Sequence, residues 1–222
     1  MNHKVAGILL AGGQSSRMGR DKAMLDIGGK PVIQRVADTL LQCTPDVCLA
    51  AANEDDYRFL HLPVAADEYP GYGPLAGIYA GMKQIEADWY LVAACDMPFT
   101  SVDLMRNLLK MAIEAAGDGV GIPLGQAIIP SYGERMHPLY AVYHRTVLPS
   151  LREALEHKQL KVMEWVDEHN LVDVPLEGQL PRREGEFPES YDITPWCLYN
   201  MNDPEAYEQA RRMYILKEMP GN

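Results

Sequence analysis

The chain has 222 residues, of which 47% are hydrophobic, and it carries 31 acidic against 20 basic residues, for a formal net charge of −11. A chain of this size suits one α/β domain with a substantial core. The acidic balance argues against a nucleic-acid-binding protein, because phosphate backbones require a broad basic face. With no apolar run near the length of a membrane span and no C-x-x-C pair among four cysteines, we expect a cytoplasmic protein without membrane contact.

Apolar strands and amphipathic helices alternate through the first half of the chain. The predicted elements in chain order are a strand at Val5–Ala11, a helix at Pro31–Cys43, a strand at Asp46–Ala52, a short helix at Asp55–Leu60, a brief strand at Pro63–Ala66, a helix at Leu75–Ile85, a strand at Trp89–Ala94 and a helix at Ser101–Ala115. This alternation is typical of right-handed βαβ units and a mostly parallel sheet that helices cover on both faces.

The second half of the chain is less regular. It predicts strands at Gly119–Ile129 and Leu139–His144 with a hairpin-like excursion between them, helices at Thr146–Glu156 and Val162–Asp167, a strand at Leu171–Val174, a polar surface loop at Gln179–Thr194, a last strand at Cys197–Met201 and a closing helix at Asp203–Lys217. Because no repeat, low-complexity tract or linker interrupts the pattern, we expect residues 1–222 to form a single domain.

The loop after the first strand is small, polar and basic. Residues Leu9–Leu25 read LLAGGQSSRMGRDKAML, with three cations and one carboxylate in an otherwise acidic chain. Ligands of open α/β sheets bind beyond the carboxyl ends of the strands. Glycines there let backbone N–H groups approach phosphate oxygens, and Arg17, Arg20 and Lys22 can neutralise them. Neither G-x-x-x-x-G-K-[ST] nor G-x-G-x-x-G is present, so the loop predicts a phosphate site of another kind.

The arrangement L-A-G-G-x-S-x-R-M-G-x-D-K, which begins at Leu10, resembles the nucleotide-binding signature of the molybdenum cofactor guanylyltransferase family (the molybdopterin-guanine dinucleotide biosynthesis protein A family). Further matches follow in order over nearly the full length: GKP at Gly29–Pro31, GPLAG at Gly73–Gly77, CDMPF at Cys95–Phe99, HPL at His137–Leu139 and NMNDPE at Asn200–Glu205. The resemblance implies a single-domain, Rossmann-like (GT-A-type) three-layer α/β/α fold with a mostly parallel, twisted sheet. It also implies that the N-terminal half binds nucleotide and the C-terminal half binds the acceptor.

The resemblance implies a magnesium-dependent nucleotidyltransferase. Such an enzyme transfers GMP from Mg·GTP to the molybdopterin phosphate of molybdenum cofactor and releases pyrophosphate. The carboxylate of Asp96 follows a buried strand and is the candidate Mg²⁺ ligand, with Asn202 as the second. Lys22 and Arg17 would hold the triphosphate, which makes them, with Asp96, the candidate catalytic residues. The resemblance implies further nucleotide contacts from Leu10, Ala11, Gly12, Asn53 and Asp67.

Several of these residues also have ordinary structural interpretations. Asp96 and Asn202 can cap a helix or turn, and Lys22 can be a solvated surface charge. Asn53 and Asp67 can likewise cap the elements that follow them. His137 is as suited to a structural hydrogen bond as to orienting a substrate phosphate.

The acceptor side departs from the family pattern. Where the family carries paired basic residues before a V-M helix start, this chain keeps only Lys161. The loop Gln179–Thr194 offers Arg182 and Arg183, either as a cover for the acceptor or as ordinary surface.

Two rival functions stay open. One is a related nucleotidyltransferase that uses CTP or a sugar or polyol phosphate acceptor, because base choice depends on a few contacts. The other is a non-catalytic GTP-binding protein that delivers the cofactor to apoenzymes. The expected partners are GTP and molybdenum cofactor as substrates, and maturation proteins of molybdoenzymes are further candidates.

Overall fold

A computed structural model describes residues 3–12, 21–52, 55–115, 126–169, 171–176 and 195–218. Within these ranges the chain forms a seven-stranded sheet with the order β4-β1-β5-β8-β6-β7, and β9 pairs with β6. The strands are β1 (Val5–Ala11), β4 (Val47–Ala51), β5 (Trp89–Ala94), β6 (Ala127–Tyr132), β7 (Arg135–Met136), β8 (Tyr140–His144) and β9 (Leu171–Pro175).

Strand direction decides where the loops of the sheet meet. β1 runs parallel to β4 and β5, with Leu10 opposite both Ala50 and Ala94. β8 runs antiparallel to β5, so that it begins beside the strand end of β5, with Tyr140 opposite Ala93. The carboxyl ends of three parallel strands and the start of β8 therefore share one edge. β6 and β9 are also parallel, which confirms the mostly parallel sheet.

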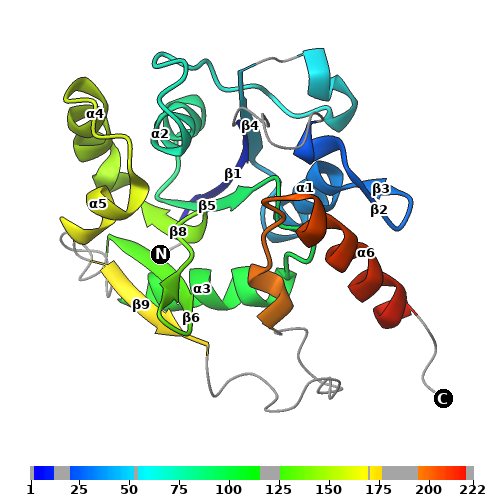
Figure 1. Cartoon of the computed structure of the whole chain (residues 1–222). Helices are drawn as coiled ribbons and strands as arrows, with labels where there is room; N and C mark the ends of the chain where they lie inside the picture. The colour runs from blue at the N-terminus through cyan, green and yellow to red at the C-terminus, as the bar shows by residue number, and fades with distance from the viewer. Residues whose placement is uncertain are drawn as a thin grey trace.

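Helices cover both faces of the sheet. Figure 1 shows α1 (Val32–Cys43) and α3 (Val102–Ala115) on one side, and α2 (Pro74–Gln84), α4 (Leu148–Glu156) and α5 (Val162–Asp167) on the other. Successive strand residues point to opposite faces, and accordingly Leu9 belongs to the core cluster under α1 and α3, whereas Ile8 belongs to the one under α2. The three-layer α/β/α architecture is confirmed. No helix in the described part of the chain has the length and apolarity to cross a membrane.

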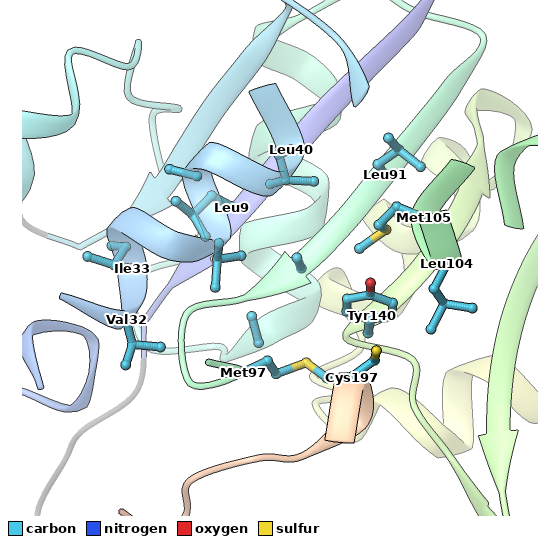
Figure 2. Packing of buried hydrophobic residues seen from close by; sticks show 14 of the residues in the cluster. Leu9, Val32, Ile33, Leu40, Leu91, Met97, Leu104, Met105, Tyr140 and Cys197 are labelled. Atoms are coloured by element: carbon cyan, nitrogen blue, oxygen red, sulfur yellow. The ribbon is translucent and has the colours of Figure 1, made fainter. Parts of the chain in front are cut away.

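The core under α1 and α3 extends to the loops at the carboxyl edge. Figure 2 shows Met97, from the loop after β5, in the same cluster as Tyr140 of β8 and Cys197 from the C-terminal region. These side chains are almost fully buried. Burial of a side chain of this size stabilises the fold by about 2 kcal/mol. Segments far apart in the sequence are thus anchored together at this edge.

Helix α2 approaches β1 unusually closely at Gly81. A Cβ atom at this position would lie 2.6 Å from Cγ2 of Ile8, a contact that real Cβ atoms do not make. Because Ile8 is fully buried in the central strand, its side chain has no free space to move into. Glycine at position 81 therefore sets the distance between α2 and the sheet.

Three predicted elements in the first half of the chain differ in the structure. The first helix begins at Val32, because Pro31 ends an unpredicted antiparallel hairpin of β2 (Asp26–Ile27) and β3 (Lys30–Pro31). Residues Asp55–Leu60 form a 3-10 helix (η2) with a kink at Tyr57. The brief strand at Pro63–Ala66 is a single bridge between Leu49 and Val64.

The predicted last strand, Cys197–Met201, is wrong. The segment instead begins as a 3-10 helix, η4 (Pro195–Leu198), and runs irregularly to Met201. Its apolar residues pack on the end of the core rather than entering the sheet, and the N–H of Met201 donates to the carbonyl of Asp96 at 2.9 Å. A short apolar run occurs both in buried strands and in irregular segments that cover the core, so the sequence pattern here did not distinguish between them. The predicted strand Gly119–Ile129 is observed from Ala127, and residues 116–125 and the loop 179–194 lie outside the described residues.

The closing helix α6 (Pro204–Glu218) packs on the β2–β3 hairpin, as Figure 1 shows. The Tyr207 hydroxyl donates to the carbonyl of Asp26 at 3.0 Å. Gly28 has a φ of +63°, and a Cβ atom there would overlap the ring of Tyr214. The guanidinium of Arg35 lies 4.5 Å from the centre of the same ring. The C-terminal helix thus holds the hairpin that follows the basic loop.

Candidate functional site

The ends of β1 and β5 converge at the carboxyl edge of the sheet. The N–H of Cys95 donates to the carbonyl of Leu10 at 2.9 Å, which continues the β1–β5 pairing past the end of β5. Leu10 and Ala11 are buried, whereas Gly12 is exposed and has open space where a Cβ would stand. Asp96 therefore lies beside the point where the chain leaves β1 for the basic loop, as predicted.

Asp96 is held in place from the C-terminal part of the chain. The side-chain amide of Asn200 donates to Oδ1 of Asp96 at 3.1 Å. Burial raises the pKa of the Asp96 carboxyl above its ordinary value, while the Lys22 ammonium, the Asn200 hydrogen bond and the Arg135 guanidinium oppose that rise. The site thus contains a partly desolvated carboxylate with two cations close to it.

Lys22 lies in η1 (Lys22–Met24), a single 3-10 turn directly after the basic loop. The turn begins at Asp21, whose Oδ1 accepts from the N–H of Ala23 at 3.0 Å. Ala23 is fully buried and anchors the turn, but Lys22 remains partly exposed. Its ammonium acts on both Cys95 and Asp96, and it forms no salt bridge with any described residue. Its charge therefore lies near the carboxylate of Asp96.

The oxygen atoms around Asp96 fit a magnesium ion. Within the described ranges, no group of three or more His, Cys, Asp or Glu side chains is arranged to hold a metal. Mg²⁺ nevertheless needs only one or two protein oxygens when waters and substrate phosphates complete its shell. Asp96 offers a carboxylate, and Oδ1 of the neighbouring Asn200 is buried with no hydrogen-bond partner among the described residues. An unsatisfied hard oxygen beside a carboxylate is the donor chemistry that this ion requires.

The other predicted site residues have different positions. Asp67 is exposed, and its Oδ1 accepts from the N–H of Tyr69 at 2.8 Å. This contact caps a turn, which is the structural interpretation given for Asp67 in the sequence analysis. Asn202 is exposed in the segment that leads into α6, two residues after Asn200. Arg17 and Asn53 lie outside the described residues. The structure thus brings together Asp96, Lys22 and the end of β1.

Sequence reasoning missed three residues near the site. Asn200 lies in the NMNDPE segment, but Asn202 of that segment was the candidate metal ligand predicted from the sequence. Arg135, on β7, lowers the pKa of Asp96 through its charge. Tyr57 donates from its hydroxyl to Oδ2 of Asp21 at 2.6 Å. The sequence gives little indication of these roles. The contacts of Tyr57 and Asn200 join residues that are 36 and 104 positions apart, and Arg135 lies on a strand of only two residues.

His137 lies on the same edge as Arg135. Its N–H donates to the carbonyl of Pro130 at 2.9 Å, and its own carbonyl accepts from Tyr140. Burial lowers the pKa of the imidazole to about 4, and the Arg135 charge acts in the same direction. His137 is therefore neutral at physiological pH and can donate or accept a hydrogen bond without adding charge.

Comparisons with known proteins agree with this geometry. The family model described as "MobA-like NTP transferase domain" matches residues 7–172. The chain is similar to the molybdenum cofactor guanylyltransferase of Vibrio cholerae, with 30% identity over 91% of this chain and 89% of the relative. It is 32% identical to the probable molybdenum cofactor guanylyltransferase of Pelotomaculum thermopropionicum over 95% of this chain and 93% of that one. The crystal structure of molybdopterin-guanine dinucleotide biosynthesis protein A from Archaeoglobus fulgidus shares the fold, with a TM-score of 0.74, 23% identity and coverage of 96% of this chain and 100% of that one.

Proposed function

The chain belongs to the MobA-like NTP transferase family, and we propose that it is a molybdenum cofactor guanylyltransferase, which transfers GMP from GTP to the phosphate of molybdopterin. The family resemblance expected from the sequence motifs is confirmed. The observation that carries the proposal for this chain is the convergence of Asp96 and Lys22 on the carboxyl end of β1.

The reaction is a substitution at the α-phosphorus of GTP. An oxygen of the acceptor phosphate forms a bond to this phosphorus, the bond to the β-phosphate oxygen breaks, and pyrophosphate leaves with the electron pair. The barrier is largely electrostatic, because an anion approaches an anionic centre. Mg²⁺, when bound by Asp96 and an amide oxygen of Asn200 or Asn202, supplies positive charge at the phosphates.

The nucleotide side is assigned to the N-terminal half of the chain. Lys22 and Arg17 hold the triphosphate and stabilise the charge of the departing pyrophosphate. The backbone of Leu10, Ala11 and Gly12 contacts the nucleotide, and Asn53 and Asp67 bind the guanine or the ribose. The partly exposed ammonium of Lys22, which has no carboxylate partner in the described ranges, supports this assignment.

The acceptor side is assigned to the C-terminal half. Arg135, on β7, is a second cation whose charge acts on Asp96, in addition to Lys22. An arginine in this position can pair with the terminal phosphate of the pterin, and the neutral His137 can add a hydrogen bond. Asn200 also comes from this half, so that the two halves of one domain meet at Asp96.

Replacing Arg135 by Ala tests the acceptor assignment. We expect the KM for the pterin acceptor to rise about ten-fold, because a charge-assisted hydrogen bond to phosphate is lost. The KM for GTP should change much less, as measured by steady-state kinetics with each substrate varied in turn. Arg106→Ala, an exposed arginine on α3, is the matched control. A rise confined to the KM for GTP would move Arg135 to the nucleotide side.

A single-turnover assay tests the function itself. Each labelled nucleoside triphosphate is mixed with the protein, Mg²⁺ and molybdopterin-bound molybdenum cofactor, and pyrophosphate release is followed. We expect release with GTP only, and none when the pterin is omitted. Release with CTP or with a sugar phosphate acceptor would identify a related nucleotidyltransferase instead. Tight GTP binding without turnover would identify a cofactor-delivery protein.

The setting of the reaction is the cytoplasm. Cys43, Cys48 and Cys95 form no disulfide in the structure, which suits a reducing compartment. Maturation proteins of molybdoenzymes are the partners that would receive the product.

A further inference from the structure

We propose that Tyr57 is a positioning residue for Lys22, because its hydrogen bond to Asp21 fixes the turn that presents the lysine to the triphosphate. The inference rests on the proposed function, since it takes Lys22 as a ligand of the nucleotide phosphates. It adds to that function a residue from the segment after β4, which belongs to none of the recognised motifs.

The geometry places Asp21 between two donors. The hydroxyl of Tyr57 donates to Oδ2 of Asp21 at 2.6 Å, and the N–H of Ala23 donates to Oδ1 at 3.0 Å. Both carboxylate oxygens are therefore held, one from a distant segment and one from within the turn. Lys22 lies between the carboxylate and the buried Ala23, so that the backbone conformation at Lys22 is restricted on both sides.

Tyr57 is itself well anchored. It is 8% exposed and packs in the core cluster under α1 and α3, in the η2 segment that follows β4. Burial raises the pKa of its hydroxyl, and the hydrogen bond to Asp21 raises it further, so that the group stays protonated and remains a donor. A rigid donor at this place can hold the carboxylate in one orientation.

The charge of Asp21 explains why its orientation matters. An unrestrained carboxylate next to Lys22 can turn toward the ammonium, where it would compete with phosphate for the charge of Lys22. The hydrogen bond from Tyr57 instead holds Oδ2 of Asp21 toward the buried tyrosine. Lys22 accordingly forms no salt bridge with Asp21 or any other described residue.

The test removes only the hydroxyl. In Tyr57→Phe, we expect the Kd for Mg·GTP and for inorganic tripolyphosphate, both measured by titration calorimetry, to rise about ten-fold. The KM for GTP should rise in parallel, and kcat should change little. Tyr90→Phe is the matched control, because its hydroxyl donates to the carbonyl of Ile85 at 2.9 Å in the core under α2. This control should leave both Kd values unchanged.

A double-mutant cycle separates positioning from packing. If Tyr57 acts through Lys22, the Phe substitution has no further effect on tripolyphosphate binding in a Lys22→Ala background. If the effect depends on the charge of Asp21, the Phe substitution likewise has no further effect in an Asp21→Asn background. Equal losses of affinity with and without Lys22, or wild-type affinity in Tyr57→Phe, would overturn the inference. Wild-type protein that binds tripolyphosphate but not GTP would overturn the proposed function instead and would leave the Tyr57 test readable.

Discussion

Asp96→Asn is expected to lower kcat about a thousand-fold while the protein stays folded. The amide keeps the size of the side chain and can still accept from Asn200, but it loses the negative charge that a magnesium ion requires. Pyrophosphate release in the single-turnover assay measures the loss. Asp103→Asn, an exposed carboxylate in the first turn of α3, is the control and should leave turnover near the wild-type rate.

The same substitution is expected to raise Tm at neutral pH. Burial raises the pKa of Asp96 in the folded state, so that between the unfolded and folded pKa values the folded chain binds more protons. This carboxyl therefore makes stability fall as the pH rises through that window, and its charge is destabilising at pH 7. Asparagine removes the charge, and the gain should vanish at acid pH, where the wild-type carboxyl is protonated too. A Tm below that of the wild type at pH 7, together with near-normal turnover, would contradict the assigned role.

Gly81→Val is expected to lower the free energy of unfolding by about 3 kcal/mol. The first added carbon already falls 2.6 Å from Ile8, and the two γ-carbons of valine need further space between α2 and β1. The slightly better helix propensity of valine over glycine, a few tenths of a kcal/mol, does not offset this overlap. Urea denaturation measures the change from the shift of its midpoint.

The control for this prediction is Gln84→Val, an exposed position near the end of the same helix. It introduces the same side chain into α2 without touching the sheet, and it should change stability by less than about 0.5 kcal/mol. A loss of less than about 1 kcal/mol in Gly81→Val would mean that α2 can move away from β1. Since β1 leads directly into the candidate site, we also expect the GTP affinity of the folded variant to fall.

The sequence predicted the alternating half of the molecule well. The limits of β1 and β5 agree with the structure to the residue, because each is a continuous apolar run that follows a charged residue. In the less regular second half, the limits of α5 also agree to the residue. The segments near the C-terminus were harder to predict from the sequence. The run at Cys197–Met201 is apolar because it covers the end of the core, and no local pattern separates such a cover from a strand.

The residues of the candidate site likewise fall into those that the sequence predicted and those that it did not. Lys22 was identified because it lies in the L-A-G-G-x-S-x-R-M-G-x-D-K segment, and Asp96 because it follows a buried strand in the CDMPF segment. Asn200, Tyr57 and Arg135 were missed because they reach the site across the fold. Asn200, for example, is 104 residues from the carboxylate that it contacts.

Composition and periodicity by themselves determined the fold class of this protein, the order of the long strands and helices in its first half, and the strand ends where a phosphorylated ligand would bind. These properties depend on neighbouring residues, whose spacing the chain carries directly. The tertiary structure alone decided which asparagine holds Asp96, which tyrosine holds Asp21, and how closely α2 approaches the sheet. Each of those is a contact between distant segments, and it exists only once the packed core has brought them together.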